Sequence, residues 1–211
     1  MSRRDSEATK DALLTAGAAL FADRGFDGAT LDLIARKARV NKAMVNYHFG
    51  GKKGLYTAIL GAAFSSLEDR LGMLRDSPRP ADELLREFVA LFAEMAGDHP
   101  TLPVMLVREV ISGGEHLDRS VLPHILAIFG TVRGIVEKGI REGTFRAVDP
   151  LLTHLTLIGS LVFFFATERF RGRAISAGHL PVEAPSSEAF VRHIQELVAR
   201  GLTAPKTERA S

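Results

Sequence analysis

A run of basic side chains lies between Asp32 and Glu68, with no acidic residue among them. Its members, with Tyr47 and His48 between them, are Arg36, Lys37, Arg39, Lys42, Lys52 and Lys53. Basic side chains neutralise phosphates and interleaved aromatic side chains can pack on a groove, so this pattern indicates a nucleic-acid surface. A charge run is more often only a solvated face, and this chemistry therefore needs support from the elements that position the residues.

The overall charge hides this basic segment. The 211 residues carry 27 basic and 25 acidic side chains, a formal net charge of +2. Residues 1–60 hold ten basic and six acidic side chains, a net charge of +4, whereas the rest of the chain carries −2. The first 60 residues are therefore the part expected to meet nucleic acid.

Two short helices are predicted to carry the basic run. Thr30 is expected to cap a helix over residues 31–38. Asn41 is expected to cap a second helix that ends near His48. Only residues 39–41 separate the two helices, which is typical of a helix-turn-helix whose second helix enters the major groove of DNA.

The second of these helices is predicted to present small and polar side chains outward. They are Lys42, Ala43, Asn46 and Tyr47. An asparagine can hydrogen-bond an adenine edge, a lysine can reach phosphate or guanine, and Ala43 or Met44 can contact a thymine methyl. This is the composition that a groove-reading helix needs.

The remainder of the chain also reads as helix, because apolar residues recur at helical spacing between Gly and Pro breaks. The expected helices cover residues 13–25, 53–74, 80–95, 102–111, 119–141, 150–170 and 187–200, with a loop over 172–186. No alternating pattern typical of strands is present. We therefore expect an all-α chain of about nine helices.

The residue types exclude most enzyme and metal classes. The chain has no cysteine, which removes disulfides, thiol catalysis and cysteine-ligated zinc or iron–sulfur sites. It has no H-E-x-x-H or G-x-S-x-G motif, and Lys53 stands where a phosphate-binding loop needs Ser or Thr. The seven histidines lack the i, i+4 pairing that favours a metal site. We expect no catalytic residue, metal or cofactor, and a protein that is not an enzyme.

Apolar stretches in this sequence are short. The longest, residues 155–166, has about a dozen residues, whereas roughly 20 are needed to span a bilayer. The N-terminal residues are polar and no signal peptide is visible. The expectation is a cytoplasmic protein without a membrane partner.

Three segments at consistent spacing resemble the tetracycline-repressor (TetR/AcrR) family of bacterial transcription regulators. Residues 13–26 (LLTAGAALFADRGF) resemble its opening helix, and residues 30–40 (TLDLIARKARV) its second helix. Residues 46–56 (NYHFGGKKGLY) resemble the end of its recognition helix and the start of its fourth helix. The resemblance covers residues 8–60. It implies an N-terminal three-helix DNA-binding domain of the helix-turn-helix type, followed by a C-terminal helical domain for ligand binding and dimerisation.

Three positions depart from the pattern of the family. Arg39 stands where the turn usually has glycine, so this turn must adopt a non-glycine conformation or be slightly strained. Asn41 replaces a common serine or threonine cap, which is a conservative exchange. Asn46 stands where the family often has a phosphate-contacting tyrosine, and it could add a base contact instead.

The resemblance also implies which residues contact double-stranded DNA. The phosphate anchors would be Thr30, Lys42, Tyr47, His48 and Lys52. The base-reading candidates are Arg39, Ala43, Met44 and Asn46, beside the cap Asn41. Arg3 and Arg4 could form an arm that reaches a minor groove, although a terminal tail is the more common outcome.

We expect three parts in the chain. They are a DNA-binding domain with an N-terminal arm over residues 1–52, a ligand-binding and dimerisation domain over residues 53–203, and a flexible tail over residues 204–211. A homodimer would match a palindromic operator whose half-sites lie about 34–36 Å apart. The resemblance implies a repressor that a small-molecule effector releases from this operator.

The candidate pocket residues of the second domain are Phe64, Phe88, Phe92, Met105, Arg108, His124, Phe129, His154 and Phe164. Aromatic residues at helical spacing are usually core, so two other functions stay open. They are an architectural DNA-binding protein and a regulator that answers to a partner protein. A cavity of roughly 300 Å³ or more among residues 61–170 would favour ligand sensing, and a solid core would favour the alternatives.

Overall fold

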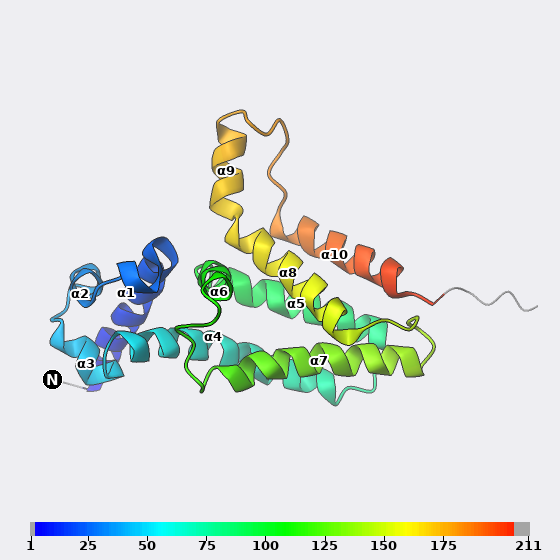
Figure 1. Ribbon diagram of the computed structural model, residues 1–211, viewed down its shortest axis with the longest axis horizontal. Helices are drawn as coiled ribbons and strands as arrows, with labels where there is room; N and C mark the ends of the chain where they lie inside the picture. The colour runs from blue at the N-terminus through cyan, green and yellow to red at the C-terminus, as the bar shows by residue number, and fades with distance from the viewer. Residues whose placement is uncertain (1–2, 205–211) are drawn as a thin grey trace, which may run out of the picture.

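The computed structural model describes residues 3–204, and this part of the chain contains helices and no strand (Figure 1). In chain order the helices are α1 (Arg3–Gly28), α2 (Leu31–Ala38), α3 (Ala43–Phe49), α4 (Lys52–Arg75), α5 (Ala81–Asp98), α6 (Leu102–Ile111), α7 (Leu122–Arg141), α8 (Pro150–Ala166), α9 (Glu168–Ser176) and α10 (Ser187–Leu202). The predicted all-α fold class is confirmed. Residues 205–211 of the predicted tail, and Met1 and Ser2 of the predicted arm, lie outside the described residues.

The described chain has ten helices rather than nine, because the predicted helix over residues 150–170 divides into α8 and α9, and α9 extends to Ser176 in the predicted loop. The break between α8 and α9 has a local cause. The hydroxyl of Thr167 donates to the carbonyl of Phe163 at 2.6 Å, and the guanidinium of Arg171 donates to the carbonyl of Phe164. These side chains hydrogen-bond to carbonyl groups in the last turn of α8. The helix axis bends by 51° between α8 and α9, and α9 projects from the rest of the molecule in Figure 1.

The first three helices and the start of α4 form a small head at one end of the molecule (Figure 1). Leu13, Ile34, Val45 and Leu55, one from each of these helices, are fully buried against one another. Residues from Arg3 onward, predicted in part as an arm, form the first turn of α1 instead. Four helices thus share one core, and that core fixes the position of α3.

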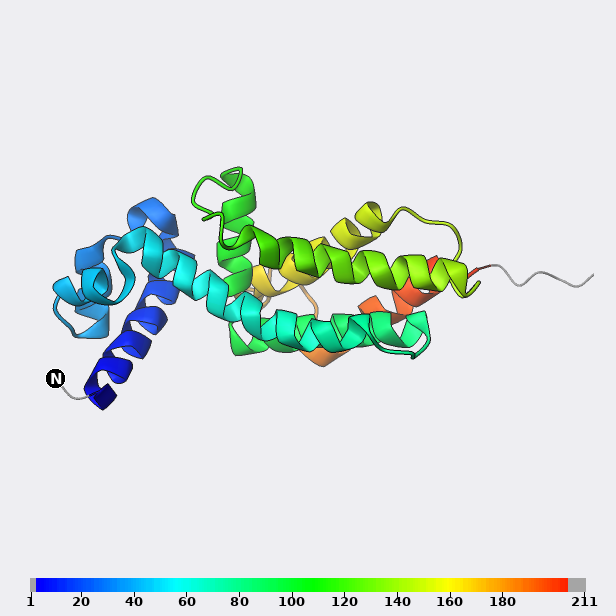
Figure 2. The same cartoon turned by 90° about the horizontal axis from the view of Figure 1, so that it is seen from below.

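Helix α4 continues from the head into the body of the molecule, which consists of the rest of α4 and of α5 to α10. There α4 lies alongside α5 and α7 (Figures 1 and 2). Its apolar face is buried along its whole length, from Leu60 to Leu74. A Cβ atom at Gly54 would lie 1.8 Å from the carbonyl oxygen of Phe49, so the first turn of α4 crosses the end of α3 where only glycine fits. Helix α4 is therefore the continuous backbone element that runs from the head into the rest of the molecule.

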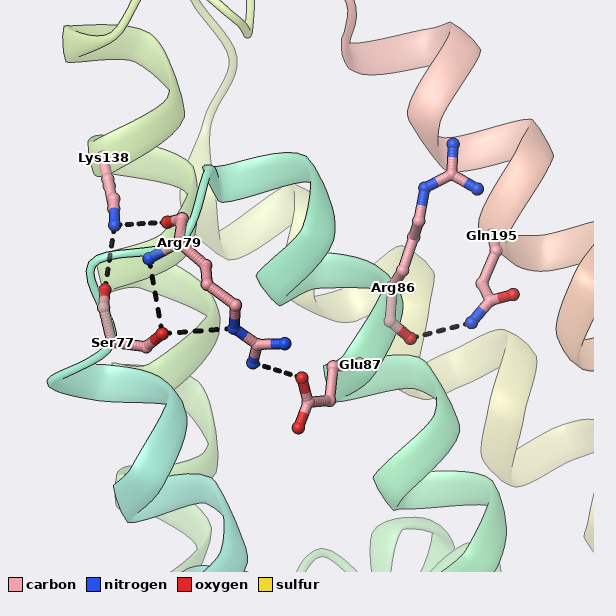
Figure 3. Close-up of polar contacts among 6 residues, drawn as sticks. All are labelled: Ser77, Arg79, Arg86, Glu87, Lys138 and Gln195. Carbon is pink, nitrogen blue, oxygen red and sulfur yellow. Dashed lines mark hydrogen bonds and ion pairs between the residues drawn. The ribbon is translucent and has the colours of Figure 1, made fainter.

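Polar contacts close the body at the end far from the head (Figure 3). Lys138 of α7 donates to the carbonyls of Ser77 and Arg79, at 3.0 and 2.6 Å, in the turn between α4 and α5. Gln195 of α10 donates to the carbonyl of Arg86 in α5 at 2.8 Å. These bonds tie α7 to the turn between α4 and α5, and α10 to α5. No single helix in the described range is long and apolar enough to cross a bilayer. Helices α8 and α9 have the required length and apolar composition only when taken together, and the pair is bent by 51°.

Candidate nucleic-acid interface and the cavity behind it

Thr30 caps α2 as predicted, whereas Asn41 lies one residue before Lys42, the N-cap of α3, and bonds to the first turn of that helix from there. The hydroxyl of Thr30 accepts a hydrogen bond from the backbone N–H of Leu33 at 3.3 Å, at the start of α2. The side-chain oxygen of Asn41 accepts one from the backbone N–H of Ala43 at 2.8 Å, at the start of α3. These short-range bonds define where each helix begins and set the angle between them.

The turn between these helices keeps the conformation that suits glycine, although it carries Arg39. Arg39 has φ 57° and ψ 38°, and it is the one non-glycine residue with positive φ among residues 3–204. This conformation lets the N–H of Val40 bond to the carbonyl of Ala35 at 3.0 Å, which ends α2. A left-handed non-glycine residue costs about 1–2 kcal/mol, so the turn is strained, and its side chain is exposed beside α3.

Helix α3 turns one face outward. Ala43 and Asn46 are exposed, and the ring of Tyr47 is 75% exposed although it is aromatic. Val45 is fully buried in the head, and Met44, a predicted base-reading residue, is half-buried against the same core. The structure therefore brings together three freely accessible side chains on α3.

Two lysines of the predicted interface already have partners in the protein. Lys42 pairs with Asp32 at 2.9 Å, and both side chains are mostly exposed. The ammonium of Lys52 donates to the carbonyl of Phe26 at 3.1 Å and lies 4.3 Å from the centre of its ring. An exposed pair is weak, so Lys42 can exchange Asp32 for a phosphate, whereas Lys52 also holds the end of α1.

His48 lies at the inner edge of α3 and not on its outward face. Its ring packs edge-on against Tyr47, with ring centres 4.9 Å apart. Its Nε2 atom is buried, and no group in the described part of the chain bonds to it. The side chain is half-buried and borders the exposed surface.

Helix α6 connects the head to the body through Arg108. Arg108 was predicted to line a pocket, but its guanidinium donates to the carbonyls of Ala22 and Asp23, both at 3.1 Å. These carbonyls precede Gly25, whose φ of 74° and ψ of 176° break the helical path of α1. The bonds satisfy backbone groups left open by that break.

Glu109, the next residue, is the centre of a buried polar cluster. It is 3% exposed and accepts hydrogen bonds from the hydroxyl of Tyr56 at 2.8 Å and from the backbone N–H groups of His116 and Leu117 at 2.7 and 3.1 Å. Burial, and then the bond to Glu109, raises the pKa of Tyr56, so the phenol stays protonated and donates. The carboxylate thus joins α4 of the head to α6 and the loop that follows it.

The same loop contacts the head through aromatic rings. His116 stacks on Phe26 with ring centres 4.4 Å apart, and Phe26 in turn lies beneath the ammonium of Lys52. Tyr56 packs edge-on against Phe26 at 5.2 Å. Phe26 and Tyr56 lie in segments that carry the family resemblance, but no role was predicted for them or for His116. The one local signal was a charged pair, residues 108–109, within an otherwise apolar helix.

A cavity of about 390 Å³ lies between α4, α5, α6, α7 and α8. Of the nine predicted pocket residues, Phe64, Phe92 and His154 line it. Helix α6 contributes four residues that the sequence analysis missed: Leu106, Val107, Val110 and Ile111. These four lie on the side of α6 away from the contacts that Arg108 and Glu109 make with the head.

The other six predicted pocket residues do not line this cavity, and each has a packing reason. Phe88 and Met105 are buried in the core of the body, and Arg108 bonds to α1. His124 pairs with Glu68 across α7 and α4. Phe129 packs edge-on against His154 behind the wall, and Phe164 stacks face to face on Phe190 of α10, 3.8 Å between centres.

Two family models match separate parts of this chain. Residues 13–59 match the family model for bacterial regulatory proteins of the tetR family, and residues 80–198 match that for the tetracyclin repressor-like C-terminal domain. The transcriptional repressor NicS of Pseudomonas putida is 29% identical over 202 residues, which cover 94% of each chain.

Solved structures show the same fold. The ketosteroid transcriptional regulator KstR2 of Mycobacterium tuberculosis has a TM-score of 0.74 at 19% identity, and the match covers 93% of this chain and 95% of that one. FadR of Bacillus subtilis, in complex with stearoyl-CoA, has a TM-score of 0.70 at 18% identity, covering 90% of this chain and 97% of that one. With both of its domain models matched over most of its length, this chain belongs to the TetR family of bacterial regulatory proteins.

Proposed function

We propose that this chain is a homodimeric transcription repressor that binds a palindromic operator and releases it when a small molecule occupies the cavity of its body. Members of the family are DNA-binding transcription regulators and not enzymes. The observation that carries the proposal is the exposed face of α3, which the buried core of the head holds outward. The relative NicS is named a transcriptional repressor, which supports the sign of the regulation.

In this proposal the predicted DNA contacts on α3 and around it divide into two groups. Phosphates are contacted by Thr30, Lys42, Tyr47, His48 and Lys52. Base edges are read by Arg39, Ala43, Met44 and Asn46. Lys52 keeps its bond to Phe26 while its other N–H groups face the backbone of DNA, so its main effect is to position the head.

Dimerisation would involve the body. We assign DNA binding to a domain of residues 1–52, and ligand binding and dimerisation to a domain of residues 53–203. Leu152 of α8 and Leu197 of α10 are each more than half exposed, although they are large and apolar. A second copy of the chain would cover such surface and set two α3 helices one turn of DNA apart. The operator lies on the bacterial chromosome, so we place the protein in the cytoplasm.

Helix α6 is the element that would couple cavity and head. One of its sides lines the cavity, and its other side holds α1 through Arg108 and α4 through Glu109. A ligand that shifts α6 must therefore move the head relative to the body. Release of DNA requires only that the ligand binds this shifted state better than the operator-bound state. A cavity of this volume supports ligand sensing over an architectural role with a solid core.

The test is selection of genomic DNA fragments by the purified full-length protein, followed by fluorescence anisotropy on the enriched sequence. We expect one enriched sequence with two-fold symmetry, bound by two chains. Lys42→Ala should weaken binding to operator and scrambled DNA alike and lower the salt slope by about one. The exposed Lys53→Ala is a matched control for the loss of one positive charge outside α3. Enrichment of no sequence over random fragments would contradict the proposal.

A further inference from the structure

We propose that the effector is an uncharged, mainly apolar molecule with a single hydrogen-bond acceptor, bound in the cavity with that acceptor on the Nε2–H of His154. This inference rests on the proposed function and specifies its ligand. It follows from the chemistry of the cavity wall, from the state of His154 and from the volume available.

The wall offers no counter-ion. Among the described residues that line the cavity, His154 is the one with a polar side chain, and the others are apolar or glycine. The two charged residues of α6, Arg108 and Glu109, are bonded to the head on the other side of that helix. The nearby pair of His124 and Glu68 is engaged with itself between α7 and α4. A carboxylate, phosphate or ammonium group placed against this wall would lose its hydration without compensation, so the part of the effector that the cavity encloses is uncharged.

His154 supplies one polar group to the cavity, and that group is a hydrogen-bond donor. Burial lowers the pKa of His154, so its imidazole is neutral at neutral pH and carries one N–H. Its Nδ1 atom is buried and has no hydrogen-bond partner in residues 3–204. Its Nε2 atom, in contrast, is not both buried and without a partner. The tautomer that leaves no buried donor unpaired places the proton on Nε2. The ring is held edge-on by Phe129, with centres 5.3 Å apart, so the donor has a fixed direction.

The volume limits the size of the ligand. A cavity of about 390 Å³ lies near the lower end of the range of roughly 300–1,000 Å³ that is typical of small-molecule sites. Ile111 and Phe163 line the cavity and are 80% and 66% exposed, so its mouth is apolar as well. A molecule with one polar group at His154 and an apolar body toward the mouth matches this arrangement.

Gly159 of α8 gives a way to fill the cavity without straining the protein. It lines the cavity, and a Cβ atom built on it meets no atom within 4 Å. Leucine at this position would occupy the space of a ligand and is also a better helix former than glycine. Gly134 of α7 is a matched control, since it is an exposed helical glycine with equal space around it that lines no described cavity.

The experiment measures binding of four probes that share a phenylbutyl body to the full-length protein by isothermal titration calorimetry. The probes are 4-phenylbutan-2-one, butylbenzene, 4-phenylbutanoate and 4-phenylbutylammonium. We expect the ketone to bind at least about tenfold more tightly than either ion. His154→Leu should weaken the ketone by roughly 2- to 12-fold, the value of one hydrogen bond, and leave butylbenzene unchanged. Gly159→Leu should abolish binding of all four, and Gly134→Leu should not.

Three results would overturn the proposal. They are an ion that binds as tightly as the ketone, unchanged ketone affinity in Gly159→Leu, and failure of all four probes to bind. Anisotropy with the selected operator, on the same protein preparations, separates this inference from the proposed function. If specific operator binding persists while the probe results fail, only the effector class is wrong. If operator binding itself is absent, the proposed function is wrong whatever the probes do.

Discussion

Replacing Arg39 tests whether the turn of the head trades stability for DNA recognition. In Arg39→Gly, the left-handed conformation at φ 57° no longer opposes a Cβ atom, which removes about 1–2 kcal/mol of strain. Glycine also makes the unfolded chain more flexible, which costs about 0.5–1 kcal/mol. We therefore expect the free energy of unfolding to rise by roughly 0.5–1 kcal/mol, or about 2 °C in Tm for a chain of this size.

The same substitution should weaken DNA binding, because the exposed guanidinium is proposed to contact a base. A lost bidentate contact is worth about 1–3 kcal/mol, so the operator affinity should fall by roughly 5- to 150-fold. Arg39→Ala is the matched control, since it removes the same side chain but keeps the Cβ atom in the left-handed turn.

Urea unfolding followed by circular dichroism, at one fixed protein concentration, measures stability, and anisotropy measures affinity. Arg39→Ala should lose affinity as Arg39→Gly does, without the gain in stability. The reasoning is refuted if the glycine variant is no more stable than the alanine variant, because the strain at this turn would then not exist.

Three further predictions concern the contacts of the head and the cavity. Gly54→Ala should abolish operator binding while most helical circular dichroism remains, since the added Cβ would lie 1.8 Å from the carbonyl oxygen of Phe49 and displace α3. Tyr56→Phe should lower the free energy of unfolding by about 1–3 kcal/mol, because buried Glu109 loses a donor, and an unchanged urea midpoint would argue against that bond. The lowered pKa of His154 means that the unfolded state binds more protons, so stability should fall as pH drops below 6.5, its ordinary value. His154→Leu should show a smaller fall over that range in urea titrations, and an equal fall would assign the effect to other groups.

Features set by neighbours in the chain could be predicted from the sequence. Thr30 caps α2, and Asn41 bonds to the first turn of α3, through partners two or three residues away, so residue type and spacing were sufficient. The burial of Val45 and the exposure of Asn46 follow from the helical periodicity of the apolar residues in this segment.

Features set by distant partners could not be predicted in this way. Arg108 reads as a pocket residue on an apolar helix, but its acceptors lie 85 and 86 positions earlier in the chain. Phe164 has the spacing of a lining residue and stacks on Phe190 instead. Helix α9 was not predicted as a separate helix because its nine residues bury no side chain, so it has no apolar periodicity to detect.

The central claim, that the exposed face of α3 reads DNA sequence, is tested most directly by the specificity of Asn46→Ala. The measurement is the ratio of the Kd for a scrambled duplex to the Kd for the selected operator, at one salt concentration, in the wild type and the variant. We expect a wild-type ratio on the order of 10³ or more, and a ratio lower by at least about fivefold in the variant, with the Kd for scrambled DNA unchanged. An equal ratio in the two proteins would show that Asn46 and the face it lies on do not read the operator.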